Sequence, residues 1–159
     1  MICMKTLKGK MMKKERKPLH EECATPYECL KKLICQNKGT QCAIMKEDLI
    51  KLAEKNKVNV KKSDTKEIIF VNLSKVMPIE EIAAKCNIGV RSIDIQRKFS
   101  ITGAQVKQMA SHGLFHVTGK ERFYAYGRTM TANLYSIFDF YKLGYDEVHN
   151  WLSQNTKAY

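Results

Sequence analysis

The stretch from Pro78 to Gly127 constrains the fold most, because its apolar pattern is helical at first and extended at the end. Its first part predicts three successive helices: Pro78 opens the first, Asn87 ends it in left-handed backbone, and Gly113 closes the third. Apolar residues three and four positions apart give each helix a face toward a core. They are Ile79, Ile82, Ala83 and Cys86, then Val90, Ile93, Ile95 and Phe99, then Val106, Met109 and Ala110.

The end of this stretch predicts a β-hairpin. Residues 115–117 and 123–126 are rich in aromatic and β-branched residues, which favour strands. They flank Thr118-Gly119-Lys120-Glu121, and the glycine suits a turn. We therefore expect a two-stranded ribbon with its turn near Gly119.

Residues 92–127 resemble the winged-helix gamma domain of bacterial chromosome-segregation DNA translocases. The residues that carry the resemblance are Ser92, Gln96, Arg97, Phe99, Ile101, Gly113 and Leu114. The family's aromatic-Asn-Arg-Ala run is replaced here by Thr102-Gly103-Ala104-Gln105, so one basic DNA-contacting residue is missing. The resemblance implies an α+β, mainly α fold: a winged helix-turn-helix with a small β-hairpin, preceded by short helices and followed by a C-terminal helical pair.

In such a fold the third helix, residues 102–112, would enter the major groove of DNA. Gln105 and Gln108 are suitable readers because glutamine can form two hydrogen bonds with adenine, and Lys107 lies beside them. Basic residues around the helix and the wing would contact phosphates: Arg91, Arg97, Lys98, Lys120 and Arg122. The alternative is that this face is only hydrophilic surface.

The segment before the winged unit predicts short helices, the first capped by Thr25 with Pro26 in its first turn. Residues 46–73 read as helix, extended link and capped helix, an outline similar to SAP-type DNA-binding modules. In that reading Lys61 and Lys62 meet phosphates. Residues 68–73 are also compatible with a β-strand beside the wing, because they are mostly β-branched and aromatic.

A net charge of +12 favours polyanionic partners, although a surplus of solvated lysine would give the same value. Residues 1–17 form a basic tail. We find no apolar run long enough for a secretory signal or a membrane span, so we expect an intracellular protein in the bacterial cytoplasm. The six cysteines then predict free thiols. The spacing of His20, Cys23, Cys29, Cys35 and Cys42 does not favour zinc, whose ligands usually come in close pairs.

The last segment, residues 128–159, predicts two helices, capped by Ser136 and Asp146. Aromatic residues at helical spacing there indicate either core packing or an interface with a protein partner. The candidates for such an interface are Tyr135, Phe138, Tyr141, Tyr145 and Trp151.

We find no catalytic motif and predict neither an enzyme nor a cofactor or metal site. Asp139, Asp146, Glu147 and His149 could be assembled into a nuclease site, but their spacing suits helix caps better.

The predicted organisation is a basic tail (1–17), a small helical module (18–75), a winged unit (76–127) and C-terminal aromatic helices (128–159). The predicted function is non-enzymatic DNA binding by a protein of a phage or mobile element. The alternative is an inhibitor that docks on a nuclease, since the chain is similar in size and composition to phage-encoded anti-CRISPR proteins directed at Cas9.

Overall fold

The computed structural model describes residues 17–36 and 44–155. Most of the predicted basic tail, Cys42 and the last four residues lie outside these ranges. The described elements are α2 (Leu19–Glu22), α3 (Pro26–Cys35), α4 (Lys46–Lys55), α5 (Lys66–Ser74), α6 (Ile79–Cys86), β1 (Val90–Arg91), α7 (Ser92–Phe99), α8 (Gly103–Ser111), β2 (Val117–Ala125), β3 (Arg128–Tyr135), α9 (Ile137–Lys142) and α10 (Tyr145–Asn155). In the described ranges the longest helix, α10, has 11 residues, and none is long and apolar enough to cross a membrane.

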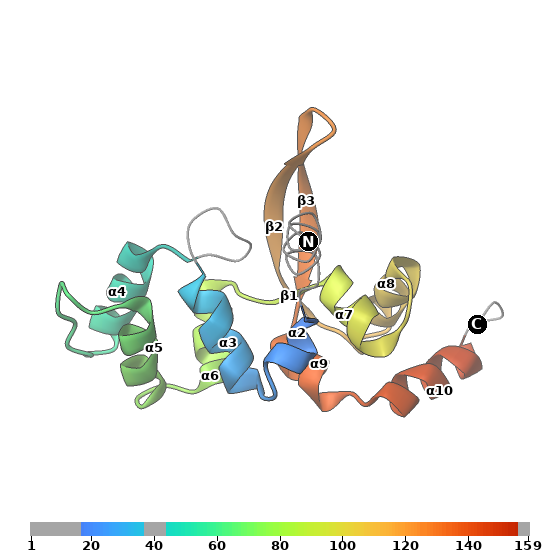
Figure 1. The fold of residues 1–159 in the computed structure, drawn as a ribbon, viewed down its shortest axis with the longest axis horizontal. Coiled ribbons are helices and arrows are strands. Elements are labelled where there is room, and N and C mark those ends of the chain that lie inside the picture. Colours follow the sequence, from blue (N-terminus) through green and yellow to red (C-terminus); the bar gives the residue numbers. More distant parts are fainter. Residues whose placement is uncertain (1–16, 37–43, 156–159) are drawn as a thin grey trace, which may run out of the picture.

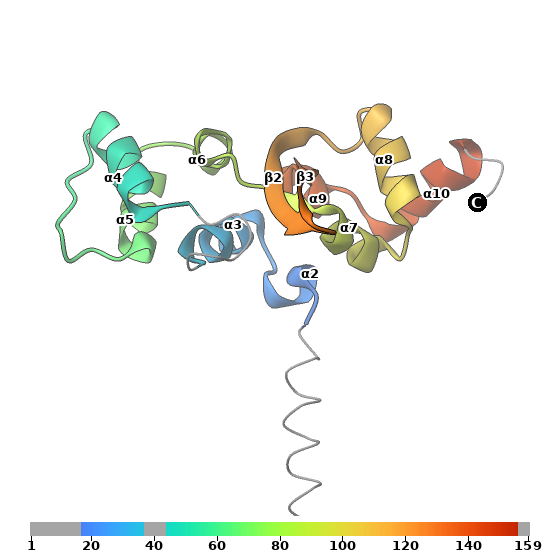
Figure 2. The same ribbon diagram turned by 90° about the horizontal axis from the view of Figure 1, so that it is seen from above.

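The fold is α+β and mainly α, as predicted. Helices α3 to α6 gather on one side of a small sheet, and α7 and α8 lie on the other (Figure 1). Seen from above, α4 and α5 form one end of the molecule, and α8 and α10 form the other (Figure 2). One continuous apolar core runs through the body and joins residues as distant as Leu30, Phe99 and Leu152. The β2–β3 hairpin rises away from this body.

Two of the N-terminal helices, α3 and α5, begin at a hydroxyl side chain that caps them. Thr25 Oγ1 accepts a hydrogen bond from the N–H of Glu28 (3.2 Å), with Pro26 in the first turn, as predicted. Thr65 Oγ1 accepts from the N–H of Ile68 in the same way (3.3 Å).

The alternative strand at residues 68–73 is therefore wrong, because α5 covers this segment. Its apolar face packs on α3, where the rings of Tyr27 and Phe70 lie 5.2 Å apart. The cap and this packing outweigh the strand propensity of the sequence.

The winged unit has the predicted order of helices. Asn87 ends α6 with left-handed backbone (φ 57°), and Gly113 follows α8 with φ 83°. Val106 and Met109 are buried, as the periodicity of the third helix indicates. Two residues of the second apolar set depart from the prediction. Val90 is buried but lies in β1 before the helix, and Ile93 is 44% exposed at the start of α7.

The sheet is antiparallel, in the order β1-β3-β2, and the predicted position of the hairpin turn is wrong. Strand β2 runs without a turn through residues 118–121, and the chain reverses at Tyr126-Gly127, where Ala125 pairs with Arg128. Both turn residues have positive φ (54° and 73°), as a two-residue type I′ turn requires. The hairpin consequently extends to Tyr135, beyond the predicted end of the winged unit.

Gly119 serves a different purpose from the one predicted. The strand register shifts between Val117 and Gly119, which marks a β-bulge. A Cβ atom at position 119 would lie 2.0 Å from Asn87 Oδ1. Gly119 thus allows the residue that ends α6 to pack against the base of the hairpin.

The C-terminal helices follow the prediction at Ser136, whose hydroxyl accepts hydrogen bonds from the N–H groups of Phe138 and Asp139. The predicted cap at Asp146 is wrong. Helix α10 already begins at Tyr145, and the carboxylate of Glu147 accepts from the N–H of Gly144 (3.3 Å).

We predict that Gly89→Ala destabilises the fold by about 1–3 kcal/mol, because overpacked sites force backbone shifts. The added Cβ would lie 2.6 Å from the carbonyl oxygen of Tyr135 and 2.5 Å from Thr118 Oγ1. Urea unfolding of both proteins measures the difference. The control is Gly144→Ala, whose Cβ would meet only Glu147 Oε1 at 3.9 Å. An equal effect of the two substitutions would contradict this account of the hairpin base.

Candidate nucleic-acid interface

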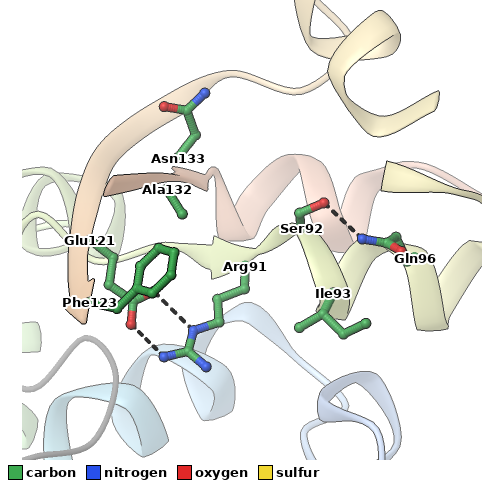
Figure 3. Close-up of a pocket in the computed structure, with 8 residues that line it drawn as sticks. All are labelled: Arg91, Ser92, Ile93, Gln96, Glu121, Phe123, Ala132 and Asn133. Carbon is green, nitrogen blue, oxygen red and sulfur yellow. Dashed lines mark hydrogen bonds and ion pairs between the residues drawn. The ribbon is translucent and has the colours of Figure 1, made fainter. Parts of the chain in front are cut away.

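The β2–β3 hairpin presents two different faces, because successive side chains of a strand point to opposite sides. The inner face carries Glu121, Phe123 and Ala132 and lies over the start of α7 (Figure 3). Together with Arg91 and Ile93 from β1 and α7, these residues line a groove of about 410 Å³.

The inner face is tied to the body by an ion pair. Arg91 Nε donates to Glu121 Oε2 at 2.9 Å, and Nη2 pairs with Oε1 (Figure 3). The main-chain N–H of Arg91 donates to Asp94 Oδ2 at 3.0 Å. Burial raises the pKa of the Asp94 carboxyl above its usual value, against the opposing effect of Arg91. Arg91 was predicted to contact phosphate; its guanidinium instead holds β2 to the junction of β1 and α7.

The outer face of the hairpin is polar, basic and free of acidic residues. It consists of Lys120, Arg122 and Tyr124 on β2 and their pairing partners Asn133, Thr131 and Thr129 on β3. Of these, Asn133 also lines the groove at the base of the hairpin. All six are exposed. None of the ion pairs found within residues 17–36 and 44–155 involves Lys120 or Arg122, so both predicted phosphate contacts remain available for a ligand.

Lys98 was also predicted to contact phosphate, but it points into the body. Its Nζ lies 5.0, 4.8 and 5.1 Å from the ring centroids of Phe99, Phe140 and Tyr141, and it donates to the carbonyl of Phe140. Burial lowers the pKa of this ammonium. Lys98 therefore joins α7 to α9.

Helix α8 offers less to a DNA groove than its sequence indicates. Gln105 Oε1 accepts from the N–H of Thr102 (2.8 Å), so this predicted reader completes a capping box at the start of the helix. Gln108 Nε2 lies 3.4 Å from the carbonyl oxygen of Asn155, in α10. His112 packs on Trp151, also in α10, with ring centroids 5.3 Å apart. Lys107 is exposed and is the basic residue of α8.

The remaining predicted phosphate contacts lie apart from the hairpin tip. Arg97 is exposed on α7 and lines a second groove with Lys17 and Lys32, in which Glu22 and Asp94 also take part. Lys61 and Lys62 are exposed in the link between α4 and α5, where Lys61 N–H donates to Asp64 Oδ2 at 2.9 Å. The helix–extension–helix order of residues 46–74 agrees with the sequence outline.

Most of the predicted partner-binding aromatic residues contribute to the interior. Tyr135 is 2% exposed in β3, and the Tyr141 hydroxyl donates to the carbonyl of Cys23 (2.6 Å). Phe138 and Trp151 pack partly buried against the core. Tyr145 is exposed (51%), with its ring 4.4 Å from that of His149.

The exposed aromatic residues lie instead near the tip of the hairpin. Phe123, Tyr124 and Tyr126 are 39%, 75% and 92% exposed. Their sequence pattern predicts strands, and none of the three was predicted as a site residue. The available signal was Tyr126-Gly127, a bulky residue followed by glycine between two strand-like segments.

Three of the four titratable groups that the sequence placed in a conceivable nuclease site, Asp139, Glu147 and His149, have other partners. Asp139 Oδ2 accepts from the N–H of His116 and contacts its Nδ1 at 2.8 Å, and Glu147 faces the start of α10. His149 Nε2 bonds to the carbonyl of Phe99 (2.5 Å). In the part of the chain that the structure describes, no three His, Cys, Asp or Glu side chains gather as a metal site would require. Among the described residues, Cys23, Cys29, Cys35 and Cys86 are not joined in disulfide bonds.

No protein-family model matches the chain, and neither curated proteins nor solved structures gave a match. The resemblances to the translocase gamma domain, to SAP-type modules and to anti-CRISPR proteins therefore stay predictions from the sequence.

We predict that Lys98→Ala lowers stability by about 1–3 kcal/mol, since it removes a charge-assisted hydrogen bond and three ring contacts. Lys107→Ala, in an exposed position on α8, should change stability by less than about 0.5 kcal/mol. Thermal and urea unfolding measure both. A Lys98→Ala protein with unchanged stability would show that the ammonium does not hold α7 to α9.

Proposed function

We propose that this chain is a non-enzymatic DNA-binding protein whose principal contact is the outer face of the β2–β3 hairpin. The observation that carries the proposal is the charge of that face. Lys120 and Arg122 are exposed there without an acidic neighbour, because the one carboxylate of β2, Glu121, points to the inner face and is paired with Arg91. Such a face attracts a polyanion and has no charge that repels it.

The geometry of the hairpin supports the same proposal. The ribbon stands clear of the helices, so its outer face can approach a duplex without a clash with the body (Figure 1). The major groove of B-DNA is wide enough for a two-stranded β-ribbon. Lys107 on α8 adds a further exposed positive charge on the same half of the molecule.

In this proposal α8 has a smaller part than a recognition helix usually has. Gln105 is held by the cap of its own helix and Gln108 faces α10, so direct readout of adenine by these two side chains would require both contacts to break. Binding is then dominated by phosphate contacts, which position a protein on DNA but carry little sequence information. A protein with this role acts in the cytoplasm of a bacterial cell.

The alternative proposal, an inhibitor docked on a nuclease such as Cas9, needs a surface for a protein partner. The C-terminal aromatic residues predicted to form it are mostly packed inward, which weakens this alternative. A pull-down from lysate before and after nuclease digestion separates the two. Retention of one nuclease after digestion, with inhibition of its DNA cleavage by the purified chain, would favour the inhibitor.

We predict that Lys120→Ala combined with Arg122→Ala weakens binding to a blunt DNA duplex and reduces its salt dependence. Each lost phosphate contact lowers the slope of log affinity against log salt concentration by about 0.9, so the pair should lower it by about 1.8. Fluorescence anisotropy titrations at several salt concentrations measure the slope.

The matched control for this pair is Lys75→Ala combined with Lys85→Ala, two exposed lysines on the α5–α6 side of the molecule. It removes the same number of charges and should leave the slope nearly unchanged. If the affinity of the unaltered protein for DNA does not change with salt concentration, the proposed function is overturned. Equal losses in the two double variants would overturn the assignment to the hairpin.

A further inference from the structure

Tyr126 occupies a position that its side chain disfavours. It is the first residue of the two-residue turn and has φ 54°, a conformation that is costly for a bulky residue and easily adopted by Asn, Asp or Gly. Asn-Gly would form the same turn at lower cost. A residue kept in disfavoured backbone at an exposed loop points to a role outside folding.

Contacts among the described residues do not explain this tyrosine. Its side chain is 92% exposed, the largest value among the exposed large apolar and aromatic residues of the described ranges. None of the ring–ring contacts found in residues 17–36 and 44–155 involves Tyr126 or Tyr124. Tyr124, two residues earlier, is 75% exposed on the outer face of β2. Two aromatic rings therefore stand in solvent at the end of the ribbon.

The charges around these rings indicate which ligand they meet. Arg122 precedes Tyr124 on the outer face. Arg128 follows the turn directly and pairs with Ala125, so it flanks the tip from the inner face. Both are exposed, and neither is in any of the ion pairs found for the described residues. Aromatic rings beside unpaired guanidinium groups suit nucleic acid, because the rings stack on bases while the cations neutralise phosphates.

We propose that the hairpin tip, Tyr124 and Tyr126 with Arg122 and Arg128, binds unpaired bases where a DNA duplex opens into single strands. Bases inside a duplex have both faces covered by their neighbours, so an aromatic ring stacks on them only where the stack ends or the strands separate. The tip lies farthest from the body, and a duplex held along the outer face would bring its end to the two tyrosines. The inference rests on the proposed DNA binding and adds the structure of the preferred substrate.

The test compares a blunt DNA duplex with the same duplex extended by unpaired thymidine arms, in anisotropy titrations at one salt concentration. We expect the unaltered protein to bind the forked DNA at least about tenfold more tightly, since stacking of one base on an aromatic side chain commonly contributes that factor or more. Tyr124→Ala combined with Tyr126→Asn should bring the forked DNA to the affinity of the blunt duplex. The readout is the ratio of the two affinities, because Tyr124 also belongs to the outer face and a lost duplex contact lowers both affinities by the same factor.

The choice of substitutions separates folding from binding. Tyr126→Asn places a residue that tolerates positive φ in the turn, so the melting temperature of this variant should not fall. Tyr124→Phe and Tyr126→Phe keep the rings and should keep the preference for forked DNA. Tyr145→Ala removes an exposed tyrosine of α10 and should also keep it.

The outcomes distinguish this inference from the function on which it rests. Equal affinity of the unaltered protein for the two DNAs, or a fork preference that survives in the doubly substituted protein, would overturn the role of the tip and leave duplex binding intact. Failure to bind either DNA would overturn both. Loss of a captured protein partner in the tyrosine variants, with DNA binding unchanged, would assign the tip to a protein surface and also overturn the inference.

Discussion

The attachment of the hairpin to the helical body depends on a small region around β1. Strand β1 pairs with β3 through Val90 and Arg91. The Arg91 guanidinium also forms an ion pair with Glu121 of β2. Gly89 and Gly119 leave room at this base, since a Cβ atom at either position would lie within 2.6 Å of an oxygen atom. An arginine–carboxylate pair of this geometry fixes orientation as well as distance. The base is thus ordered by several independent contacts.

This arrangement divides the basic residues into two groups with different roles. Arg91 and Lys98 interact with other groups of the fold. Arg91 pairs with Glu121, and Lys98 contacts the carbonyl of Phe140 and three aromatic rings. Lys120 and Arg122 lie one strand position away from Glu121 yet face the opposite side. Alternation along a single strand therefore produces an inner face that contacts the body and an outer face whose two positive charges are in none of the ion pairs found for the described residues.

Local rules predicted the parts of this fold that depend on local chemistry. Thr25, Ser136, Asn87 and Gly113 act at helix ends as the sequence indicates, because a cap needs only neighbouring backbone. Composition could not place the turn of the hairpin. Gly119 is required by the close approach of the Asn87 side chain, which is distant in sequence, and Tyr126 occupies a turn position where glycine or asparagine is expected. Of the site residues, Lys120 and Arg122 could be found from the pattern of the strand. The contacts of Arg91 and Lys98 could not be predicted, because folding brings their partners close from distant parts of the sequence. Gln105 is held instead by the cap of its own helix.

The disfavoured backbone conformation of Tyr126 depends on the ordered base of the hairpin at β1. A strained, exposed residue persists only when the surrounding structure holds its conformation, and here the paired strands and their anchored base do so. A tip on a loose ribbon would lose much of its binding energy to the ordering of the ribbon, whereas an anchored ribbon arrives already ordered. Helix α8, packed against α10 through His112 and Trp151, has no comparable freedom to reach a ligand. The hairpin that projects from the body therefore has a base held both by strand pairing and by the Arg91–Glu121 ion pair (Figure 1).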